Sequence, residues 1–355
     1  MIENFINSER KIVNKQLEKY FRSLSKNQND PLLKDFLDQT KKFMLNERAK
    51  RIHPALLVAS FNGIINPMYL EDQINDVRKV AMAVEFLHNG QLIQDDLIDD
   101  DLIRRDSPTF HIQFKNELEK VDQDKKNFEK SSTLYGRNMG IIGASFAYNL
   151  GQDIIKCSKF PKNQKLLAFQ EYTEAVDSIL KGQIIEDYME FHRITMSLEQ
   201  YLNIAEMIRA CVFEKSSKIG AIFAKGNIHY QIKPLSEAML RIGQAMAISD
   251  DIIDLKKDIR SKKKKVVYII ALQNTNEAQS KRLKEIYSKK ELSENDVNEV
   301  ENLFKETNAL TVSEHLAKNL ISQAKNYLND IYPDLNREQK QFFDEFADFV
   351  IKREY

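Results

Sequence analysis

Two short clusters of aspartates hold the residues of this sequence that are best suited to chemistry. The first lies within residues 94–105, QDDLIDDDLIRR, and the second within residues 249–258, SDDIIDLKKD. Each contains two adjacent aspartates and a third one turn along: Asp95, Asp96 and Asp99 in the first, and Asp250, Asp251 and Asp254 in the second. On a helix the aspartates four residues apart share a face, and the second of each trio lies about 100° around from the first. Such a group of like charges repels itself unless a cation is present. Grouped oxygen ligands of this kind suit magnesium, which binds a few carboxylates together with water and phosphate oxygens.

Basic residues follow each cluster closely. Arg104 and Arg105 follow the first, and guanidinium groups match phosphate oxygens through paired hydrogen bonds. Lys256, Lys257 and the lysines at 262–265 follow the second. One acidic cluster alone could equally be a solvated helix face, because short acidic patterns are common. Two copies, each flanked by apolar helix, instead favour a pair that clamps metal ions around one diphosphate and neutralises a leaving group.

The helices that must position these clusters are visible in the spacing of apolar residues. Residues 76–101 keep apolar side chains at helical intervals up to the first cluster. The same periodicity recurs in residues 140–155, 164–191, 198–223 and 235–255. Alternating strand patterns are scarce, and 10 Gly and 7 Pro are too few for a chain of short strands and tight turns. We therefore predict an all-α fold.

No linker rich in Pro, Gly or Ser divides the chain, so a single domain over residues 1–355 is the simplest organisation. Two segments are expected to be loops. Residues 116–133 are polar and highly charged, which predicts a loop insertion in the helical domain. Residues 261–267, SKKKKVV, would join the second acidic segment to the next helix.

The composition bounds the compartment and the partners. Basic and acidic residues both number 53, so the net charge favours neither binding nor exclusion of nucleic acid. Two cysteines, Cys157 and Cys211, exclude a disulfide framework and suggest a reducing compartment. No apolar run approaches the roughly 18–20 residues of a membrane span, and the N-terminus lacks the apolar core of a signal peptide. We expect a cytoplasmic protein with no membrane span and no nucleic-acid partner.

Four motifs in order resemble those of the trans-isoprenyl diphosphate synthases, the polyprenyl synthetase family. Residues 85–111, EFLHNGQLIQDDLIDDDLIRRDSPTFH, are similar to the family's first aspartate-rich motif, and residues 243–254, GQAMAISDDIID, to its second. Residues 181–191, KGQIIEDYMEF, resemble its Gly-Gln segment. Residues 49–54, AKRIHP, resemble its basic substrate-binding segment. The order and approximate spacing hold from there to the end of the chain.

The resemblance implies a helical bundle of the isoprenoid synthase type around a central cavity, usually a dimer, here a homodimer, and similar to geranylgeranyl diphosphate synthases. It also implies a prenyltransferase that joins an allylic diphosphate to isopentenyl diphosphate, giving a geranylgeranyl or longer product. Magnesium, as three ions bound with the allylic diphosphate, would help its carbon–oxygen bond to break. The allylic cation is then attacked by the double bond of isopentenyl diphosphate, and a proton is lost.

The same resemblance implies roles for individual residues. The six aspartates would bind the metal from opposite walls of the cavity. The implied substrate-binding residues are Lys50, His53, His88, Arg104, Arg105, Gln183, Arg209, Lys263 and Arg353, the last beside Lys352 at the C-terminus. The residues expected to set product length precede the first cluster: Leu87, Gly90 and Gln91. Since neither Gly90 nor Gln91 is aromatic, Gly90 would open the cavity about one turn below the aspartates.

Several positions depart from the family pattern, and they fall on diphosphate contacts, not on metal ligands. Arg48 and Ala49 stand where two glycines are usual, His53 replaces an arginine, Ile208 and Arg209 replace a Lys-Thr pair, Ala247 replaces a glutamine, and Ser145 an aspartate. Arg209 could supply the lost lysine's charge, although one position along a helix is about 100° around it. His53 could replace the arginine only when protonated. Alternatively, both are surface residues.

Three other functions remain open from the sequence. A terpene synthase derived from the family would ionise the allylic diphosphate without isopentenyl diphosphate; the change at His53 favours it, whereas Lys50, His88 and Arg105 argue against it. A non-catalytic subunit of a heteromeric synthase is disfavoured by the six aspartates, because clustered carboxylates inside a bundle are costly without a cation. A helical scaffold with acidic faces is the least favoured.

Overall fold

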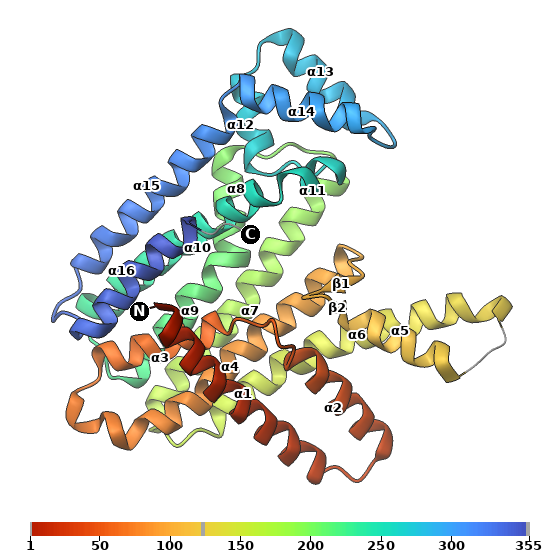
Figure 1. The fold of residues 1–355 in the computed structure, drawn as a ribbon. Helices are drawn as coiled ribbons and strands as arrows, with labels where there is room; N and C mark the ends of the chain where they lie inside the picture. Colours follow the sequence, from red (N-terminus) through yellow and green to blue (C-terminus); the bar gives the residue numbers. More distant parts are fainter. Residues whose placement is uncertain (1, 122–124, 353–355) are drawn as a thin grey trace. The chain divides into compact units, whose positions relative to one another are not determined.

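The computed structural model of the chain describes residues 2–121 and 125–352, which form two compact units. The first unit comprises Met1–Val176 and Lys215–Gly226, and the second comprises Asp177–Glu214 and Asn227–Tyr355. Each unit carries one of the two aspartate clusters (Figure 1). Helices dominate both, so the predicted all-α fold is confirmed. The expectation of one domain over the whole chain stays a prediction.

The first unit is built from long helices and one short hairpin. Its elements are α1 (Ile2–Lys26), α2 (Pro31–Met44), α3 (Ile52–Ile64), α4 (Pro67–Ile98), β1 (Ile103–Arg104), β2 (Ser107–Pro108), α5 (Phe110–Val121), α6 (Lys125–Lys156), the first half of α7 (Lys162–Phe191) and most of α9 (Cys211–Phe223). Its core forms where α3, α5 and α6 pack against α4.

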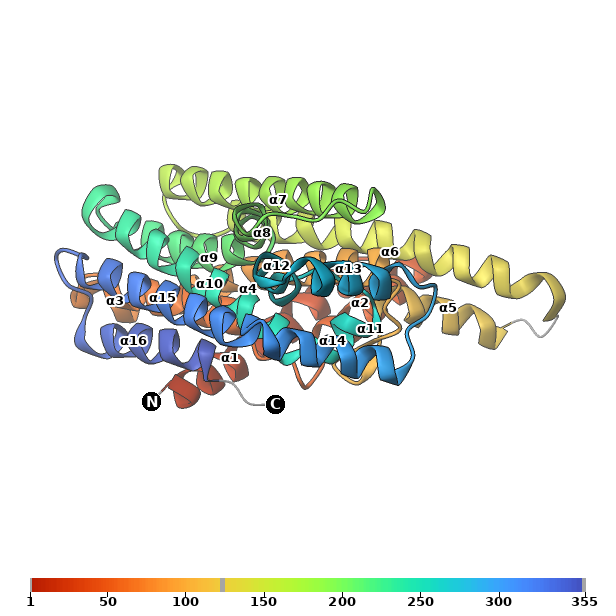
Figure 2. The ribbon, with the colours of Figure 1, turned by 90° about the horizontal axis from the view of Figure 1, so that it is seen from above.

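The second unit surrounds the helix that carries the second cluster. Its elements are the second half of α7, α8 (Leu198–Ala205), the π-helices η1 (Glu206–Ala210) and η2 (Ile228–Ile232), α10 (Lys233–Ile253), α11 (Leu255–Arg260), α12 (Val266–Asn274), α13 (Glu277–Ser288), α14 (Glu294–Glu306), α15 (Ala309–Asn329) and α16 (Arg337–Ile351). Helix α10 packs against α15 and α16, which run beside each other in Figures 1 and 2.

Helix α4 positions the first aspartate cluster at its C-terminal end. The side chain of Asn66 caps its start by accepting from the Met68 N–H at 3.0 Å, and Pro67 occupies the first turn, where no N–H is needed. Val77 and Val80 are fully buried, so the middle of the helix is anchored in the core. The helix then ends inside the aspartate cluster, which places the carboxylates in its last turn.

The loop expected at residues 116–133 is wrong for the residues that the structure describes. Residues 116–121 belong to α5 and residues 125–133 to α6, and the two helices lie side by side (Figure 1). Phe114 of α5 meets Tyr135 of α6 at a ring-centroid distance of 6.2 Å, and Ser132 Oγ donates to Glu119 Oε1 at 2.7 Å. The apolar anchors lie at the ends of the segment, and Lys and Glu are good helix formers on a solvated face.

The loop expected at residues 261–267 is shorter in the structure. Residues 261–265 connect α11 to α12, and Val266 is already the first residue of α12. Within residues 2–121 and 125–352, every helix is too short or too polar to cross a bilayer.

Candidate active site

The first aspartate cluster lies where α4 stops. The backbone N–H of Asp99 donates to the carbonyl oxygen of Asp95 at 2.9 Å and closes the last turn. Asp96 is fully buried, Asp95 is half-buried and Asp99 is exposed. The cluster therefore spans the border between the core of the first unit and its surface.

Arg104 pairs with two aspartates of this cluster. Its Nε donates to Asp96 Oδ1 at 2.6 Å, and its Nη2 donates to Asp95 Oδ2 at 3.2 Å. Burial raises the pKa of Asp96 to about 6, although the Arg104 charge and hydrogen bond oppose that rise. The other carboxylate oxygen of Asp96, Oδ2, is buried and has no hydrogen-bond partner among the described residues. An orphaned carboxylate oxygen is costly, and a bound cation would relieve that cost.

The hairpin of β1 and β2 directs two neighbouring arginines to different partners. Its turn residues, Arg105 and Asp106, have φ angles of 54° and 55°, as in a type I′ turn. Asn46 supports the turn, because its Nδ2 donates to the Arg105 carbonyl oxygen at 3.3 Å and to Ser107 Oγ at 3.1 Å. Arg104 thus reaches the aspartates, while Arg105 turns toward a separate group of buried polar residues.

That group is centred on Glu85, one of the residues that the sequence did not reveal. Glu85 accepts from Nη1 of Arg51, and both side chains are buried. Burial would raise the pKa of Glu85. The charge of Arg51, followed by His88 and Arg105, outweighs burial and holds this pKa below its ordinary value. Arg51, with a φ of 59°, points into the core, whereas its neighbour Lys50, which the family resemblance singles out, is exposed. The buried ion pair fixes the Glu85 carboxylate beside His88 and Arg105, which belong to the predicted pocket for isopentenyl diphosphate.

The histidines of this pocket are neutral at pH 7. The rings of His53 and His88 lie with their centroids 4.5 Å apart. Burial lowers the pKa of His53 to about 4, with Glu85 opposing and Arg105 adding to the effect. Burial and the neighbouring His53 likewise lower the pKa of His88 well below its ordinary value. The protonated ring that His53 needs in order to replace an arginine is therefore absent near neutral pH. A neutral imidazole can still donate one hydrogen bond.

Arg105 and His88 retain unused hydrogen-bonding atoms. Nη1 of Arg105 and Nδ1 of His88 are buried without hydrogen-bond partners among the described residues. Arg104 and Arg105 also line a cavity of about 70 Å³ together with Asn46 and Lys42. Two guanidinium groups and an amide around one small cavity suit an anion such as a phosphate group.

The residues predicted to set product length lie one to two turns before the first cluster. Leu87 is fully buried, Gly90 is buried and Gln91 is half-buried. The expected opening beside Gly90 is filled, because a Cβ at that position would meet the Tyr148 ring at 2.8 Å. The missing side chain of Gly90 admits Tyr148, whose Oη donates to Gln94 Oε1 at 3.1 Å. Sequence spacing along α4 could not reveal this neighbour on α6.

The second aspartate cluster ends α10 as the first ends α4. The Asp254 N–H donates to the Asp250 carbonyl oxygen at 2.8 Å, and Asp254 itself is exposed. Asp251 is buried and accepts from the hydroxyl of Tyr201 at 2.6 Å and from the Val266 N–H at 3.4 Å. Burial of the phenol raises the pKa of Tyr201 well above its ordinary value, and the charge of Asp251 and its hydrogen bond add to the rise. The carboxylate is thereby held at the start of α12.

Arg209 reaches this cluster from a π-helix. Its Nη1 lies 3.6 Å from Asp250 Oδ2, so it supplies positive charge beside the aspartates. It belongs to η1, a turn type that is frequent at functional sites. Gly243 of α10 lets η1 approach closely, since a Cβ there would lie 2.4 Å from the Ala210 Cα. Ile208 and Arg209 both line one cavity, together with Asp251.

Lys265 is the main residue of the second unit that the sequence did not single out. Its ammonium forms an ion pair with Glu186 of α7, and both side chains are about four-fifths buried. Burial opposes ionisation of Glu186, but Lys265, followed by Arg209 and Lys263, outweighs it and lowers the Glu186 pKa. Lys265 lines one cavity with Ile208, Ala247 and Asp251, so this cavity has an ammonium group in its wall beside a buried carboxylate. The run of lysines at 262–265 was a usable signal.

The remaining predicted residues are placed less directly. Gln183 Nε2 donates to Asp187 Oδ1 at 3.0 Å within α7. Lys263 lines a cavity with Asp251 and Asp258. Burial, followed by repulsion from Asp251, raises the pKa of Asp258 to about 6, while Lys265 and Lys263 oppose the rise. Arg353 lies outside the described residues.

Neither cluster is a complete metal cage. Within the described ranges, 2–121 and 125–352, no three His, Cys, Asp or Glu side chains converge as a ready-made metal site. Magnesium is commonly held by one or two carboxylates together with waters and substrate phosphates. The half-exposed aspartates and the orphaned Oδ2 of Asp96 fit that kind of site.

Comparisons with known proteins identify the family of the chain. Residues 34–304 match the family model described as polyprenyl synthetase. The short chain isoprenyl diphosphate synthase of Methanocaldococcus jannaschii is 28% identical over 333 residues, covering 90% of both chains. The geranylgeranyl diphosphate synthase of Saccharolobus solfataricus is 25% identical over 332 residues, covering 89% of this chain and 90% of that one.

A solved structure shares the fold. The geranylgeranyl pyrophosphate synthase of Corynebacterium glutamicum, complexed with isoprenyl diphosphate and magnesium, superimposes with a TM-score of 0.84 at 20% identity, covering 100% of both chains. The family model spans most of the sequence, including both aspartate clusters, so the resemblance read from the motifs is confirmed. The chain belongs to the polyprenyl synthetase family.

Proposed function

We propose that this chain is a prenyltransferase that condenses an allylic diphosphate with isopentenyl diphosphate to give a longer all-trans prenyl diphosphate. The observation that carries the proposal is a pair of helix ends, each with one buried aspartate and a cation beside the cluster. Family membership and the names of the curated relatives support it. The name of the Saccharolobus relative supports a product of geranylgeranyl length or longer.

Magnesium is the proposed cofactor, and it would withdraw electron density from the allylic diphosphate so that its carbon–oxygen bond can break. The six aspartates would hold it, as three ions bound with the diphosphate. In the first cluster, the buried Oδ2 of Asp96 accepts no hydrogen bond from the described residues and would bind the metal. Arg104 donates to Asp95 and Asp96 and would move to the diphosphate on binding. The bound magnesium in the Corynebacterium relative supports this choice of metal.

The first unit would hold the second substrate. Arg105 and His88 would direct their unused atoms to the diphosphate of isopentenyl diphosphate, and exposed Lys50 would add a mobile positive charge. The Arg51–Glu85 pair keeps this pocket in shape, because a buried carboxylate is fixed by a buried guanidinium. His53 would contribute a hydrogen bond but no charge.

The second unit would supply cations to the allylic diphosphate. Arg209, Lys263 and Lys265 lie around Asp250 and Asp251, where Ile208 offers no charge. Developing negative charge on a departing diphosphate is stabilised by cations that are already in place. We propose that both clusters act on one allylic diphosphate.

We further propose a cytoplasmic homodimer. Exposed apolar side chains mark possible contact surfaces in each unit: Leu134, Tyr135, Ile141 and Ile142 on α6, and Ile184, Tyr188 and Phe191 on α7. Apolar patches of this kind mark protein–protein interfaces. Light scattering should give twice the chain mass, and substituting Ile141 and Ile142 with serine should shift the protein toward monomer.

The function is tested with purified protein, magnesium and farnesyl diphosphate, with and without isopentenyl diphosphate, and product identification by mass spectrometry. A longer prenyl diphosphate that needs isopentenyl diphosphate is the expected result. Hydrocarbon or alcohol formed without isopentenyl diphosphate would assign a terpene synthase instead. Turnover in neither mixture would assign a non-catalytic subunit.

A further inference from the structure

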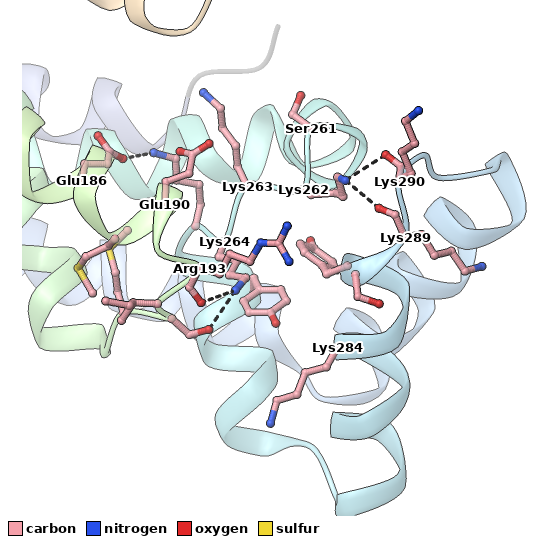
Figure 3. A pocket seen from close by; sticks show the side chains of 18 residues that line it. Glu186, Glu190, Arg193, Ser261, Lys262, Lys263, Lys264, Lys284, Lys289 and Lys290 are labelled. Carbon is pink, nitrogen blue, oxygen red and sulfur yellow. Dashed lines mark hydrogen bonds and ion pairs between the residues drawn. The ribbon is translucent and has the colours of Figure 1, made fainter.

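A large basic cavity lies in the second unit, beside but not within the second aspartate cluster. It has a volume of about 810 Å³ and is formed by the end of α7, the loop between α11 and α12, and the facing sides of α12 and α13 (Figure 3). That volume is within the range of small-molecule sites. We call it the lysine pocket.

The charge of the lysine pocket is strongly unbalanced. Eight of its lining residues are Lys or Arg, whereas two, Glu186 and Glu190, are acidic. Lys265 is paired with Glu186, and Lys289 is paired with Asp296 at 2.5 Å. One of the two acidic residues in the pocket wall is used by these pairs, and cationic residues outnumber acidic ones in the wall by eight to two.

Lys264 shows the effect of this imbalance at the centre of the pocket. Its Nζ is held by the Arg193 carbonyl oxygen at 3.4 Å and by Thr195 Oγ1 at 3.3 Å, neither of which is charged. Burial lowers the pKa of Lys264, and repulsion from Arg193 and Lys284 lowers it further. Three cations that repel one another around a cavity would be stabilised by a shared anion.

The loop is built to hold these cations in place. Lys262 Nζ donates to the carbonyl oxygens of Lys289 at 2.8 Å and Lys290 at 3.1 Å, which ties the loop to the end of α13 (Figure 3). The loop therefore has a fixed shape with its lysines half-buried, instead of a run of fully solvated side chains.

One side of the pocket is aromatic. The rings of Tyr268 and Tyr287 lie with their centroids 4.5 Å apart, and Lys264 Nζ lies 6.0 Å from the centre of the Tyr268 ring. Met189 and Met196 add apolar surface. A cationic wall beside an aromatic and apolar one suits an anion that carries an organic group.

We propose that the lysine pocket is a second, metal-independent binding site for a small molecule with a diphosphate group and an organic part. Both prenyl diphosphates and nucleoside diphosphates have this chemistry. Lysine and arginine bind phosphate oxygens directly, so no metal is required. The lysine pocket is distinct from the cavity that Arg209 and Asp251 line, although Glu186 and Lys265 line both. Lys263, which is proposed above to act on the allylic diphosphate, also lies in the wall of the lysine pocket.

Calorimetric titration in EDTA tests the proposal. Without metal, the aspartate clusters repel diphosphates, so binding reports the basic pockets alone. Inorganic diphosphate, ADP and farnesyl diphosphate are titrated separately into the full-length protein. We expect one of the two organic diphosphates to bind more tightly than inorganic diphosphate, and the tighter one identifies the source. Equal or tighter binding of inorganic diphosphate, or no binding in EDTA, would overturn the proposal.

Variants locate the binding. Arg193→Ser combined with Lys284→Ser should weaken binding in EDTA about tenfold or more, because two charge-assisted contacts are lost. Lys281→Ser combined with Lys305→Ser removes the same charge from exposed positions outside the pocket and should leave binding unchanged. Equal weakening of binding by both double variants would mean nonspecific attraction and would contradict the proposal. Loss of binding in Lys50→Ala would assign the binding in EDTA to the isopentenyl pocket and would also contradict the proposal. Magnesium-dependent turnover, measured separately, reports the proposed catalytic function and does not depend on this outcome.

Discussion

The two aspartate clusters have nearly the same sequence pattern but are supported in different ways. Asp96 is buried at the end of α4 and is met by Arg104, eight residues further along the chain. Asp251 is buried at the end of α10 and is met by Tyr201, fifty residues earlier, and by the start of α12. The first cluster therefore depends on a local hairpin, whereas the second depends on elements brought together by folding.

The first way to sharpen this comparison is Asp96→Asn. The variant should lower kcat/KM about 10²–10³-fold, because it removes a charge expected to act on the leaving group. Asp100→Asn is the matched control, since it removes an exposed charge of the same run and should change kcat/KM less than about threefold. The measurement is steady-state kinetics with saturating magnesium. Equal losses in both variants would mean that the run acts as a general acidic surface.

The second prediction concerns the long-range support of the second cluster. Lys265→Met should lower kcat/KM by about tenfold to hundredfold, the usual range for a lost charge-assisted contact. It should also lower the free energy of unfolding by about 2 kcal/mol, because Glu186 loses its partner in a largely buried site.

The double variant separates these two effects. Lys265→Met with Glu186→Gln should recover most of the stability, measured by denaturant unfolding, but not the activity. Recovery of both would show that Lys265 matters for folding and not for the diphosphate.

The third prediction uses the neutral histidine of the first unit. Burial lowers the pKa of His53 to about 4 in the folded chain, against about 6.5 in the unfolded chain. Between these values the folded chain binds fewer protons, so its stability falls as the pH falls through this window. The full difference is about 3 kcal/mol by the linkage relation.

His53→Gln should flatten the stability profile between pH 6.5 and 4, measured by denaturant unfolding at each pH. His315→Gln changes an exposed histidine and should leave the slope as it is in the unaltered protein. An unchanged slope in His53→Gln would contradict a buried neutral ring.

The fourth prediction has the smallest expected effect and concerns product length. Tyr148→Ala should shift the main product longer by about one isoprene unit, because it empties the space beside Gly90. Mass spectrometry of the products gives the result. Tyr148→Leu, which leaves a smaller cavity in the core, should shift the product less. An unchanged distribution in both variants would place the floor of the site elsewhere.

The helices and the family could be predicted from the sequence, because both depend on local spacing; the metal-binding pattern stays a prediction. Apolar periodicity located α4 and α10, and the aspartates four residues apart share a face on any helix. The sequence did not predict the helices in the described part of residues 116–133. The high charge there favoured a loop, whereas Phe114 and Tyr135 pack α5 against α6.

The rest of the candidate site could not be predicted because it depends on contacts between distant residues. The Glu186–Lys265 pair spans 79 positions, and the Arg51–Glu85 pair spans 34. The contact of Arg209 with Asp250 likewise joins η1 to α10, which are far apart in the sequence. The pKa of His53 is set by burial, which no motif reports.

The central claim, that both clusters hold one metal-bound allylic diphosphate, is tested most directly by binding of farnesyl thiodiphosphate, which resists ionisation. Calorimetric titrations are done with magnesium and, separately, in EDTA. Subtracting the second from the first gives the stoichiometry and affinity of the magnesium-dependent binding. We predict one such site per chain, with Asp96→Asn and Asp251→Asn each weakening that same site. Two sites per chain, one lost in each variant and the other unchanged, would contradict the account.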